Sequence, residues 1–336
     1  MTKYPQVNSH KGESKFKRSS SWKKYGSSQK WRSYIGIFIV IILVFAIFNG
    51  LLKTISIKKF IDDFRWDGSA SFAVVLGSSP PSLFVYQPDP KRMVIMTIPE
   101  DFYFATGRFL EPLAKISDVM SEKNGEELAR MTTVNFGTKF EKYAMFDGLS
   151  IQSRENAEEL FKRFASISTP IEILRGFGDV QTNITRGEMF GLWWQIKGLS
   201  IDQLELVDLS GFSEQIVLGS DQKVLGADEQ ALNREIKPYL ESHRIIEKGV
   251  GVEIQNASGS NSSAGLAVDL ASSVGFDVAD ISVSEAKNAK TVVFSADRNS
   301  YEAKLLAMMF DCDILGIEKE RILVVLGQDF AAKYFE

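Results

Sequence analysis

Residues 33–52 restrict the fold of this chain more than any other segment. They read SYIGIFIVIILVFAIFNGLL and include no charged side chain. A helix of this length rises about 30 Å, which matches the hydrocarbon core of a bilayer. The segment is apolar on every side, so it lacks the polar face that a helix lying on a membrane surface needs. We therefore expect a single transmembrane helix over residues 34–52.

Two alternatives fit this segment less well. Soluble domains rarely contain a buried helix so long and so uniformly apolar. A cleaved signal peptide has a shorter basic region before its apolar core and small residues at a cleavage site after it. Here the apolar run ends in Asn49-Gly-Leu-Leu-Lys-Thr-Ile, which offers no such site. We expect the helix to remain as a membrane anchor.

The predicted helix divides the charge of the chain unequally. Residues 1–33 contain nine Lys and Arg and one Glu, a net charge of +8, so the rest of the chain carries −12 within the total of −4. Basic segments are retained on the cytoplasmic side. Cations also follow the helix, but a long downstream domain is translocated largely regardless of its charge. We expect a single-pass protein of the cell membrane with a cytoplasmic N-terminus and extracytoplasmic C-terminal domains.

The arm over residues 1–33 is rich in Ser and Lys and carries aromatic side chains among its cations. Such a composition could bind anionic lipid or nucleic acid. The alternative is a disordered arm that only fixes the topology. We favour the alternative, expect the lipid bilayer as a partner, and expect no nucleic acid.

Cysteine and histidine are scarce, which limits the chemistry of the external body. Cys312 is the single cysteine, so no internal disulfide can form. His10 lies in the arm, which leaves His243 alone in the body. A histidine-based metal site or a Ser-His relay is therefore not expected.

Residues 67–226 show the pattern of an α/β or α+β domain. Short apolar or β-branched runs separated by Gly, Ser and Pro predict strands, and apolar side chains at helical spacing predict helices. Thr185–Glu188 is a capping box that marks a helix start, and Asn124-Gly125 is a candidate break in another helix. A helical connector is expected at 227–247. The expected strands cover 70–76, 83–87, 92–97 and, as the last of the domain, 204–209; the expected helices lie within 111–134 and 155–167 and after Thr185.

Residues 248–336 predict a smaller and more regular unit. The order of its elements is β-α-β-β-α-β, which is typical of a split βαβ sandwich with two helices over one sheet face. The expected strands cover 250–255, 277–283, 291–295 and 322–327, and the expected helices cover 264–274 and 300–309. The fold class of the external body is thus α/β.

This C-terminal unit resembles the LytR C-terminal domain. Val252-Glu-Ile-Gln-Asn-Ala-Ser-Gly259 stands where that family has a V-x-V-x-N-G-T/S-G strand and loop. Val324-Val-Leu-Gly-Gln-Asp-Phe330 resembles the closing V-V-L-G-x-D-F/Y of the family. Ala264–Ala267, Val274–Val278 and Thr291–Phe294 fall between them in the order that the family has.

The preceding domain is similar to the LytR–CpsA–Psr domain. Arg92-Met-Val-Ile-Met-Thr-Ile-Pro-Glu-Asp101 aligns with the family's strand ending in S-I-P-R-D, and Asp179-Val-Gln-Thr-Asn-Ile-Thr185 resembles its V-x-T-N-L-T. The resemblance implies an anchored envelope enzyme that moves a glycan from a polyprenyl-pyrophosphate carrier onto peptidoglycan. It also implies Mg²⁺, an apolar lipid pocket and arginines that grip the pyrophosphate.

Several positions depart from the pattern of this family. Glu100 replaces the arginine of I-P-R-D, and a carboxylate accepts hydrogen bonds and repels phosphate. Pro81 falls near the position of an aspartate and cannot hold Mg²⁺. The family's R-x-x-R-Q falls near Ile151-Gln-Ser-Arg154-Glu. Asp101 and Arg154 are, by resemblance alone, the candidate substrate-binding residues, although an Asp in the position of Asp101 is also typical of a turn.

We therefore predict a membrane-anchored, extracytoplasmic cell-envelope protein that acts as a non-catalytic scaffold or binding module, and we assign no catalytic, metal-binding or cofactor-binding residues. Its external domains would bind cell-wall glycan, a polyprenyl-linked precursor or another envelope protein. The alternative is a divergent phosphotransferase that attaches glycans from polyprenyl-pyrophosphate carriers to peptidoglycan and requires Mg²⁺. Two or more cations converging on an open apolar pocket near Asp101 would favour this alternative.

Overall fold

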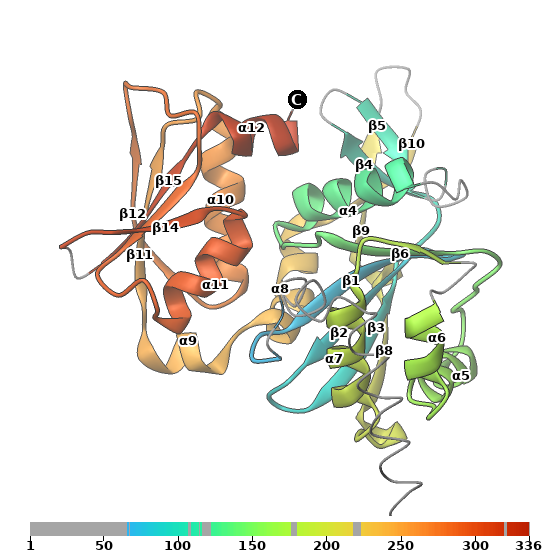
Figure 1. Cartoon of the computed structure of the whole chain (residues 1–336). Helices are drawn as coiled ribbons and strands as arrows, with labels where there is room; N and C mark the ends of the chain where they lie inside the picture. Colours follow the sequence, from blue (N-terminus) through green and yellow to red (C-terminus); the bar gives the residue numbers. More distant parts are fainter. Residues whose placement is uncertain are drawn as a thin grey trace, which may run out of the picture. The chain divides into compact units, whose positions relative to one another are not determined.

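The computed structural model describes Trp66 and residues 68–106, 109–113, 115, 122–175, 180–217, 223–318 and 321–335. The chain divides into two compact units, Met1–Phe60 and Ile61–Glu336, and every described residue lies in the second. The predicted basic arm and transmembrane helix lie outside the described residues and stay predictions. Within the described ranges, no helix is both long and apolar enough to cross a membrane. These residues form a mixed α/β structure with several sheets (Figure 1).

A six-stranded sheet is the centre of the first domain. It consists, in order across the sheet, of β7 (Val180–Thr182), β6 (Lys142–Phe146), β1 (Phe72–Gly77), β2 (Ser82–Gln87), β3 (Arg92–Thr97) and β8 (Leu204–Asp208). β2 is antiparallel to β1 and β3, while β6 is parallel to β1 and β8 is parallel to β3. β1, β3, β6 and β8 therefore run in one direction, and their carboxyl ends meet at one edge of the sheet.

Side chains of this sheet alternate between two apolar cores. Val75 of β1 and Val85 of β2 belong to the first core, whereas Val74 and Phe84 belong to the second. Successive side chains of a strand point to opposite faces, so a sheet covered on both faces needs nearly continuous apolar strands. The first core also contains residues of α4 (Glu122–Phe136) and α8 (Glu229–Leu240), and the second contains residues of α5 (Arg154–Phe164) and α7 (Arg186–Ile196).

A second sheet borders the first core and was not expected from the sequence. It consists of β5 (Phe109–Pro112), β4 (Phe102–Thr106), β10 (Lys223–Ala227) and β9 (Ser213–Val217), in this order. The helix predicted within residues 111–134 is therefore wrong at its start, because the strand β5 extends to Pro112 and pairs with β4. The expectation that the strand ending near 209 is the last of the domain is also wrong. β9 carries mostly exposed side chains, so it has no apolar periodicity to indicate it.

The predicted break at Asn124-Gly125 is absent, because α4 continues through both residues. Gly125 instead allows α4 to approach the sheet closely. A Cβ atom built on Gly125 would lie 2.3 Å from ring carbons of the buried Tyr143 in β6. The glycine thus serves helix–sheet packing and not chain reversal.

The predicted capping box at the start of α7 is confirmed. The Glu188 amide donates to the Thr185 hydroxyl at 3.2 Å, and the Thr185 amide donates to the Glu188 carboxylate at 3.0 Å. The same carboxylate oxygen accepts a hydrogen bond from Lys142 Nζ of β6 at 2.8 Å. One buried carboxylate therefore satisfies the helix start and joins α7 to the sheet.

The C-terminal unit contains a five-stranded sheet with helices over one of its faces (Figure 1). In β11, Val252 and Ile254 are buried while Glu253 and Gln255 are half-buried, as expected for a sheet covered on one face. The strands across this sheet are β12 (Asp277–Val283), β11 (Gly251–Asn256), β15 (Ile322–Leu326), β13 (Val292–Ser295) and β14 (Asp313–Gly316), and the helices are α9 (His243–Lys248), α10 (Asn261–Ser273), α11 (Tyr301–Phe310) and α12 (Gln328–Phe335).

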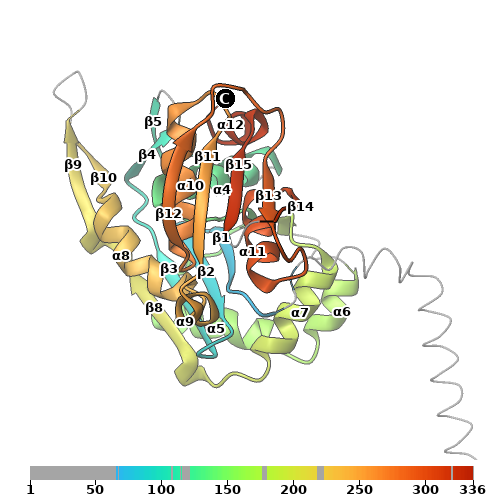
Figure 2. The ribbon, with the colours of Figure 1, turned by 90° about the vertical axis from the view of Figure 1, so that its left-hand side faces the viewer.

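The predicted split βαβ topology of this unit is wrong. β11 pairs directly and in parallel with β12, the strand at the far end of its helical crossover, and β13 pairs in the same way with β14. Each crossover therefore joins neighbouring strands, and no strand is inserted between them. β15 lies on the other side of β11, between β11 and β13 (Figure 2). The order of elements along the chain does not determine which strands become neighbours, and β14 is too short to show a pattern.

We expect Gly125→Ala to destabilise the first domain by about 1–3 kcal/mol, the usual cost of overpacking a core. Gly265→Ala is the matched control, because Gly265 is an exposed glycine inside α10 with no atom within 4 Å of a built Cβ. The control should be stabilised by up to about 1 kcal/mol, through the higher helix propensity of Ala. Urea-unfolding midpoints measure both changes. A Gly125→Ala midpoint at or above that of the unmodified protein would contradict the packing explanation.

Candidate functional site

An apolar cavity of about 360 Å³ lies on the second face of the central sheet, beneath α5, α6 (Thr169–Arg175) and α7. The sheet supplies its floor from four strands, of which β6 lies far from β1, β2 and β3 in the sequence, and the edge strand β7 adds Val180 to the lining. The helices supply its walls through side chains such as Phe161, Phe164 and Leu192. The floor consists of Val74 and Leu76 of β1, Phe84 of β2, Met93 of β3, and Ala144 and Phe146 of β6.

Few polar groups reach this cavity. Arg163, in the last turn of α5, is the one cation among its described lining residues, which also include the acids Asp147 and Glu172. The Thr169 hydroxyl donates to the Arg163 carbonyl at 2.9 Å, and Glu172 accepts from the Ser168 hydroxyl at 3.2 Å. The cavity therefore suits an apolar chain whose polar end meets a single guanidinium.

The carboxyl edge of the sheet borders one end of this cavity. The Ser79 amide, just after β1, donates to the carbonyl of Leu149, which lines the cavity, at 2.9 Å. The Ser79 hydroxyl donates to the Glu100 carboxylate, just after β3. The Ile98 amide donates to the Pro81 carbonyl at 2.8 Å. Glu100 is thus held next to the cavity edge, and the group presented there is a hydrogen-bond acceptor.

The two candidate binding residues predicted from the sequence do not line the cavity. Asp101 is exposed in the turn between β3 and β4, where the Phe102 amide donates to the Pro99 carbonyl at 3.1 Å. Arg154 is exposed in the first turn of α5 and pairs with Glu158 at 3.2 Å. Their role in binding stays a prediction by resemblance.

Arg163 does line the cavity, but the sequence did not single it out. It was only one residue of the helical pattern over 155–167, in which Phe161 and Phe164 indicated the buried side of the helix. β6 and β7, which supply part of the lining, were not predicted. The site is visible only once these distant segments come together.

The carboxyl edge does not fit the Mg²⁺ that the resemblance implies. Asp208 accepts from the Ser210 amide and hydroxyl, both at 2.9 Å, and so caps the short helix that follows β8. The Glu100 carboxylate accepts a hydrogen bond from the Ser79 hydroxyl. Among the described residues, no group of three or more His, Cys, Asp or Glu side chains could hold a metal ion. A magnesium site needs several oxygen ligands around one point, which these acids do not provide.

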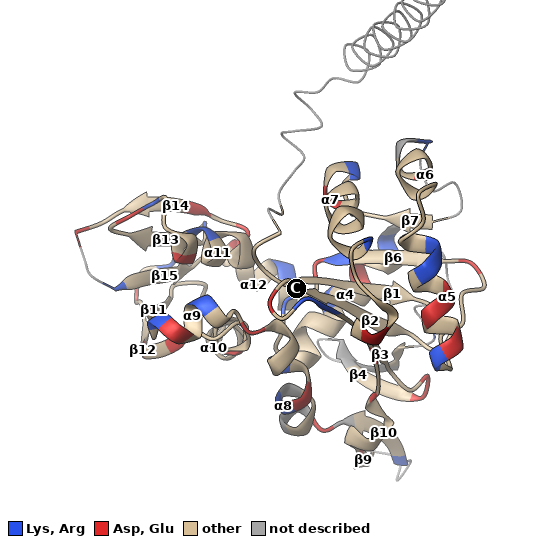
Figure 3. Cartoon of the chain, turned by 90° about the horizontal axis from the view of Figure 1, so that it is seen from below, with Lys and Arg blue, Asp and Glu red and all other residues tan. Residues whose placement is uncertain are grey.

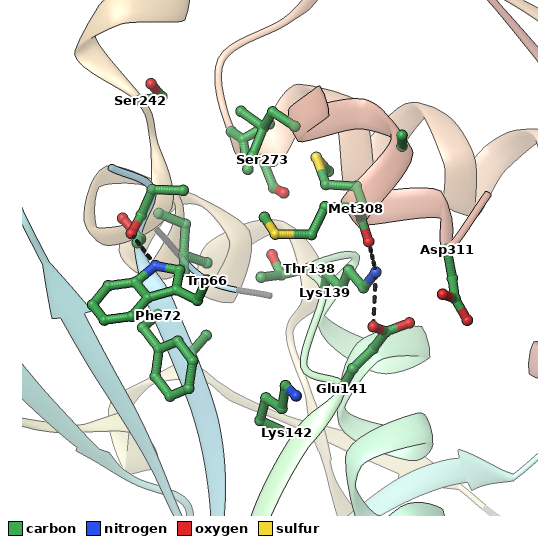
Figure 4. Close-up of a pocket in the computed structure, with 18 of the residues that line it drawn as sticks. Trp66, Phe72, Thr138, Lys139, Glu141, Lys142, Ser242, Ser273, Met308 and Asp311 are labelled. Carbon is green, nitrogen blue, oxygen red and sulfur yellow. Dashed lines mark hydrogen bonds and ion pairs between the residues drawn. The ribbon is translucent and has the colours of Figure 1, made fainter. Parts of the chain in front are cut away.

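A second cavity of about 410 Å³ lies between the first domain and the C-terminal unit (Figure 4). Lys139 donates to the Met308 carbonyl of α11, and its Nζ lies 2.8 Å from Glu141 Oε2. Lys333 of α12 donates to the other oxygen of Glu141 and lies 3.7 Å from Asp311. Burial lowers the pKa of Lys139, an effect that Glu141 opposes. Lys139, Glu141 and Lys333 thus connect the first domain to the C-terminal unit, while Asp311 is an exposed neighbour of Lys333.

The charged side chains around this second cavity form ion pairs with one another. Burial would raise the pKa of Glu141, but the charges of Lys139 and Lys333 outweigh it and hold that pKa below its usual range. Burial raises the pKa of the Cys312 thiol to about 12, so this thiol is protonated at neutral pH and is no nucleophile. The cavity is therefore best explained as part of a charged junction.

We expect Glu141→Gln to destabilise the protein at pH 7 by about 1–3 kcal/mol, because it leaves the partly buried Lys139 without its carboxylate. The pKa of Glu141 is depressed in the folded protein, so its contribution is complete above the ordinary carboxyl pKa and is lost as the pH falls through the depressed value. The loss should therefore be smaller at pH 4 than at pH 7. Urea unfolding at both pH values measures it, with the exposed Asp311→Asn as the control, expected within about 0.5 kcal/mol. Equal losses at both pH values would contradict the assignment.

Comparison with known proteins adds a family match for one part of the chain. Residues 249–330 match the family model described as LytR cell envelope-related transcriptional attenuator. No curated protein matches the chain.

Several solved structures share a weak likeness. Two of them are the transcriptional regulator yvhJ from Bacillus subtilis and B. subtilis TagV. Each is 13% identical to this chain with a TM-score of 0.39, and each match covers 51% of this chain and 98% of the solved one. TagT bound to LIIa-WTA shows 12% identity and a TM-score of 0.35, covering 52% of this chain and 92% of its own. Likeness at this level carries no conclusion about activity. The resemblance of the C-terminal unit to the LytR C-terminal domain is confirmed by the family model over residues 249–330. The resemblance of the first domain to the LytR–CpsA–Psr domain stays a prediction.

Proposed function

We propose that this chain is an anchored, extracytoplasmic cell-envelope protein whose first domain holds the apolar chain of a lipid-linked precursor without transferring it. The observation that carries this proposal is the cavity between the central sheet and α5–α7. The description of the matching family model, which names the cell envelope, supports the location of this role.

The size and lining of the cavity favour an apolar chain as its occupant. Ligand cavities in proteins fall in a range of about 300–1,000 Å³, and a volume of about 360 Å³ lies at its lower end. Phe84, Phe146, Phe161 and Phe164 supply much of the lining, and burying apolar surface against them stabilises a bound hydrocarbon by about 25 cal/mol per Å². A prenyl chain of a few isoprene units fits these properties.

The polar groups near the cavity favour binding over transfer. Transfer of a phosphoryl-linked glycan requires cations on the phosphates and acids that hold a metal ion. The described lining contributes Arg163 together with Asp147 and Glu172, and Glu100 stands at the edge beside Ser79. Carboxylates near a pyrophosphate raise its free energy through repulsion. The phosphate of the ligand is therefore expected to meet the exposed Arg163, with the rest of the head group extending toward solvent.

We expect Arg163→Gln to weaken the binding of a short-chain polyprenyl phosphate by about 3–10-fold, because a charge-assisted phosphate contact at an exposed position is lost. Lys162→Gln is the matched control. Lys162 is the neighbouring cation in the last turn of α5, but it faces solvent and pairs with Glu158 at 3.6 Å. Calorimetric titration in detergent measures both affinities, with the corresponding polyprenol as a neutral ligand. If the unmodified protein binds neither ligand, the cavity does not hold a prenyl chain.

The non-catalytic part of the proposal is tested at Glu100. The full chain with Mg²⁺ and a radiolabelled lipid-linked glycan should transfer nothing to peptidoglycan. Glu100→Arg should raise the affinity for a polyprenyl pyrophosphate by up to about tenfold, which one charged contact can supply, yet restore no transfer. Glu100→Gln separates the removal of the negative charge from the gain of a cation. Mg²⁺-dependent turnover by the unmodified protein would show that the phosphotransferase alternative is correct.

A further inference from the structure

α6 and α7 lie next to each other (Figure 3). Four apolar side chains of these helices and of the turn before α6 are exposed. Ile167, in the turn before α6, is 91% exposed, and Trp194 of α7 is 57% exposed. Ile171 of α6 and Phe190 of α7 complete this set, which we call the α6–α7 patch. Exposed Trp and Ile side chains at one place on a protein surface mark a site of interaction.

Trp193 holds the members of the α6–α7 patch together. Its ring centroid lies 5.4 Å from that of Phe190 and 6.0 Å from that of Trp194. Its indole N–H donates to the Ser166 carbonyl at 3.0 Å, which fixes the turn that carries Ile167. Trp193 itself is buried with Ile173 and Met189. A small apolar cluster beneath the α6–α7 patch, formed by Trp193, Ile173 and Met189, therefore supports it.

Cations accompany the patch although the external body is acidic. Lys197 Nζ lies 3.2 Å from the ring centroid of Trp194 and 4.7 Å from that of Trp193. Phe190, Trp194 and Lys197 follow the spacing i, i+4, i+7 and so share the outer face of α7 and its end. Arg175 and Arg186 are also exposed on these helices. Of the two acids there, Glu188 is buried against Lys142, and Glu172 lines the cavity.

The patch lies beside the point where the chain enters the external body. A Cβ atom built on Gly68 would lie 3.2 Å from Gln195 Nε2, and Tyr86 donates to Gln195 Oε1 at 3.4 Å. Gln195 directly follows Trp194. The predicted transmembrane helix ends at residue 52, so thirteen residues separate it from Trp66, a span of at most about 45 Å. The predicted anchor would therefore keep the point of attachment within this distance of the membrane.

The inner sides of the same helices line the apolar cavity. Thr169 and Glu172 of α6 and Met189 and Leu192 of α7 face it. One pair of helices therefore separates the cavity from the α6–α7 patch.

We propose that the α6–α7 patch docks the external body onto the surface of a bilayer that contains anionic lipid, an inference that rests on the proposed anchor and lipid cavity. Trp and Ile insert at the level of the head groups, where an indole has both an apolar and a polar environment. Lys197, Arg175 and Arg186 meet the phosphates at the same depth. Docking presents the α6–α7 side of the cavity to the membrane that supplies its ligand.

The test uses the full chain reconstituted in vesicles of phosphatidylcholine and phosphatidylglycerol. A fluorophore is attached to Ile167→Cys in a Cys312→Ser background and is quenched by nitroxide-labelled lipid. Val283→Cys is the matched control, because Val283 is an apolar residue of β12 that is 76% exposed and lies outside the patch. Quenching should be at least about threefold stronger at 167 than at 283, since interfacial side chains lie about 5–10 Å into the head-group region. Equal quenching at both positions would overturn the proposal.

Two further variants separate docking from ligand binding. Ile171→Ser with Trp194→Ser should reduce the quenching at 167 to the level at 283, while polyprenyl phosphate binding in detergent stays within about twofold, because neither residue lines the cavity. Lys197→Glu should reduce docking about fivefold on vesicles with phosphatidylglycerol and little on phosphatidylcholine alone. Unchanged quenching in the double variant would refute docking through this patch. Failure of the unmodified chain to bind prenyl phosphate in detergent would instead refute the cavity assignment and leave the docking result standing.

Discussion

Burial of the six-stranded sheet on both faces is the constraint on which the rest of the first domain depends. Because successive side chains alternate, each strand must supply two apolar rows, one to the core beneath α4 and α8 and one to the core beneath α5 and α7. The first core is filled closely, to the extent that α4 needs a glycine against Tyr143. The second is not, and the space left beneath α5–α7 is the cavity.

Under the proposed function, the position of this cavity would allow the first domain to bind a lipid chain without transferring its head group. Strands that run in one direction bring their carboxyl ends to one edge, where ligands of α/β proteins commonly bind. Here that edge carries Ser79 and Glu100, with Asp147 on the cavity side. The electrostatic character at the edge opposes a pyrophosphate, whereas the apolar lining still favours a hydrocarbon chain. Binding energy from the chain and chemistry at the head group are thus separable properties of the site.

The C-terminal unit contacts the first domain through paired charges as well as apolar side chains, since Ala70 and Val134 of the first domain pack against the core of the C-terminal unit. Glu141 accepts from a lysine on each side of the junction, and Arg130 of α4 donates to the Tyr334 carbonyl of α12 at 3.0 Å. Such contacts are strong only while both partners are present, since a buried ammonium without its carboxylate is costly. The charged groups of the junction therefore favour one arrangement of the two parts.

The sequence by itself determined the features that depend on neighbouring residues: the α/β class, the strands near 83–87 and 92–97, the capping box at Thr185, and the resemblance of residues 249–330. Strand order, β4, β9, β10 and β14, and the uninterrupted α4 were decided by tertiary structure, because pairing between distant segments overrides a short or polar local pattern. The cavity was likewise decided by tertiary structure, since its floor and walls come from segments as distant in the sequence as β1 and α7. Local periodicity identifies which side chains are buried, but only the folded chain decides which buried side chains meet and where they leave a space.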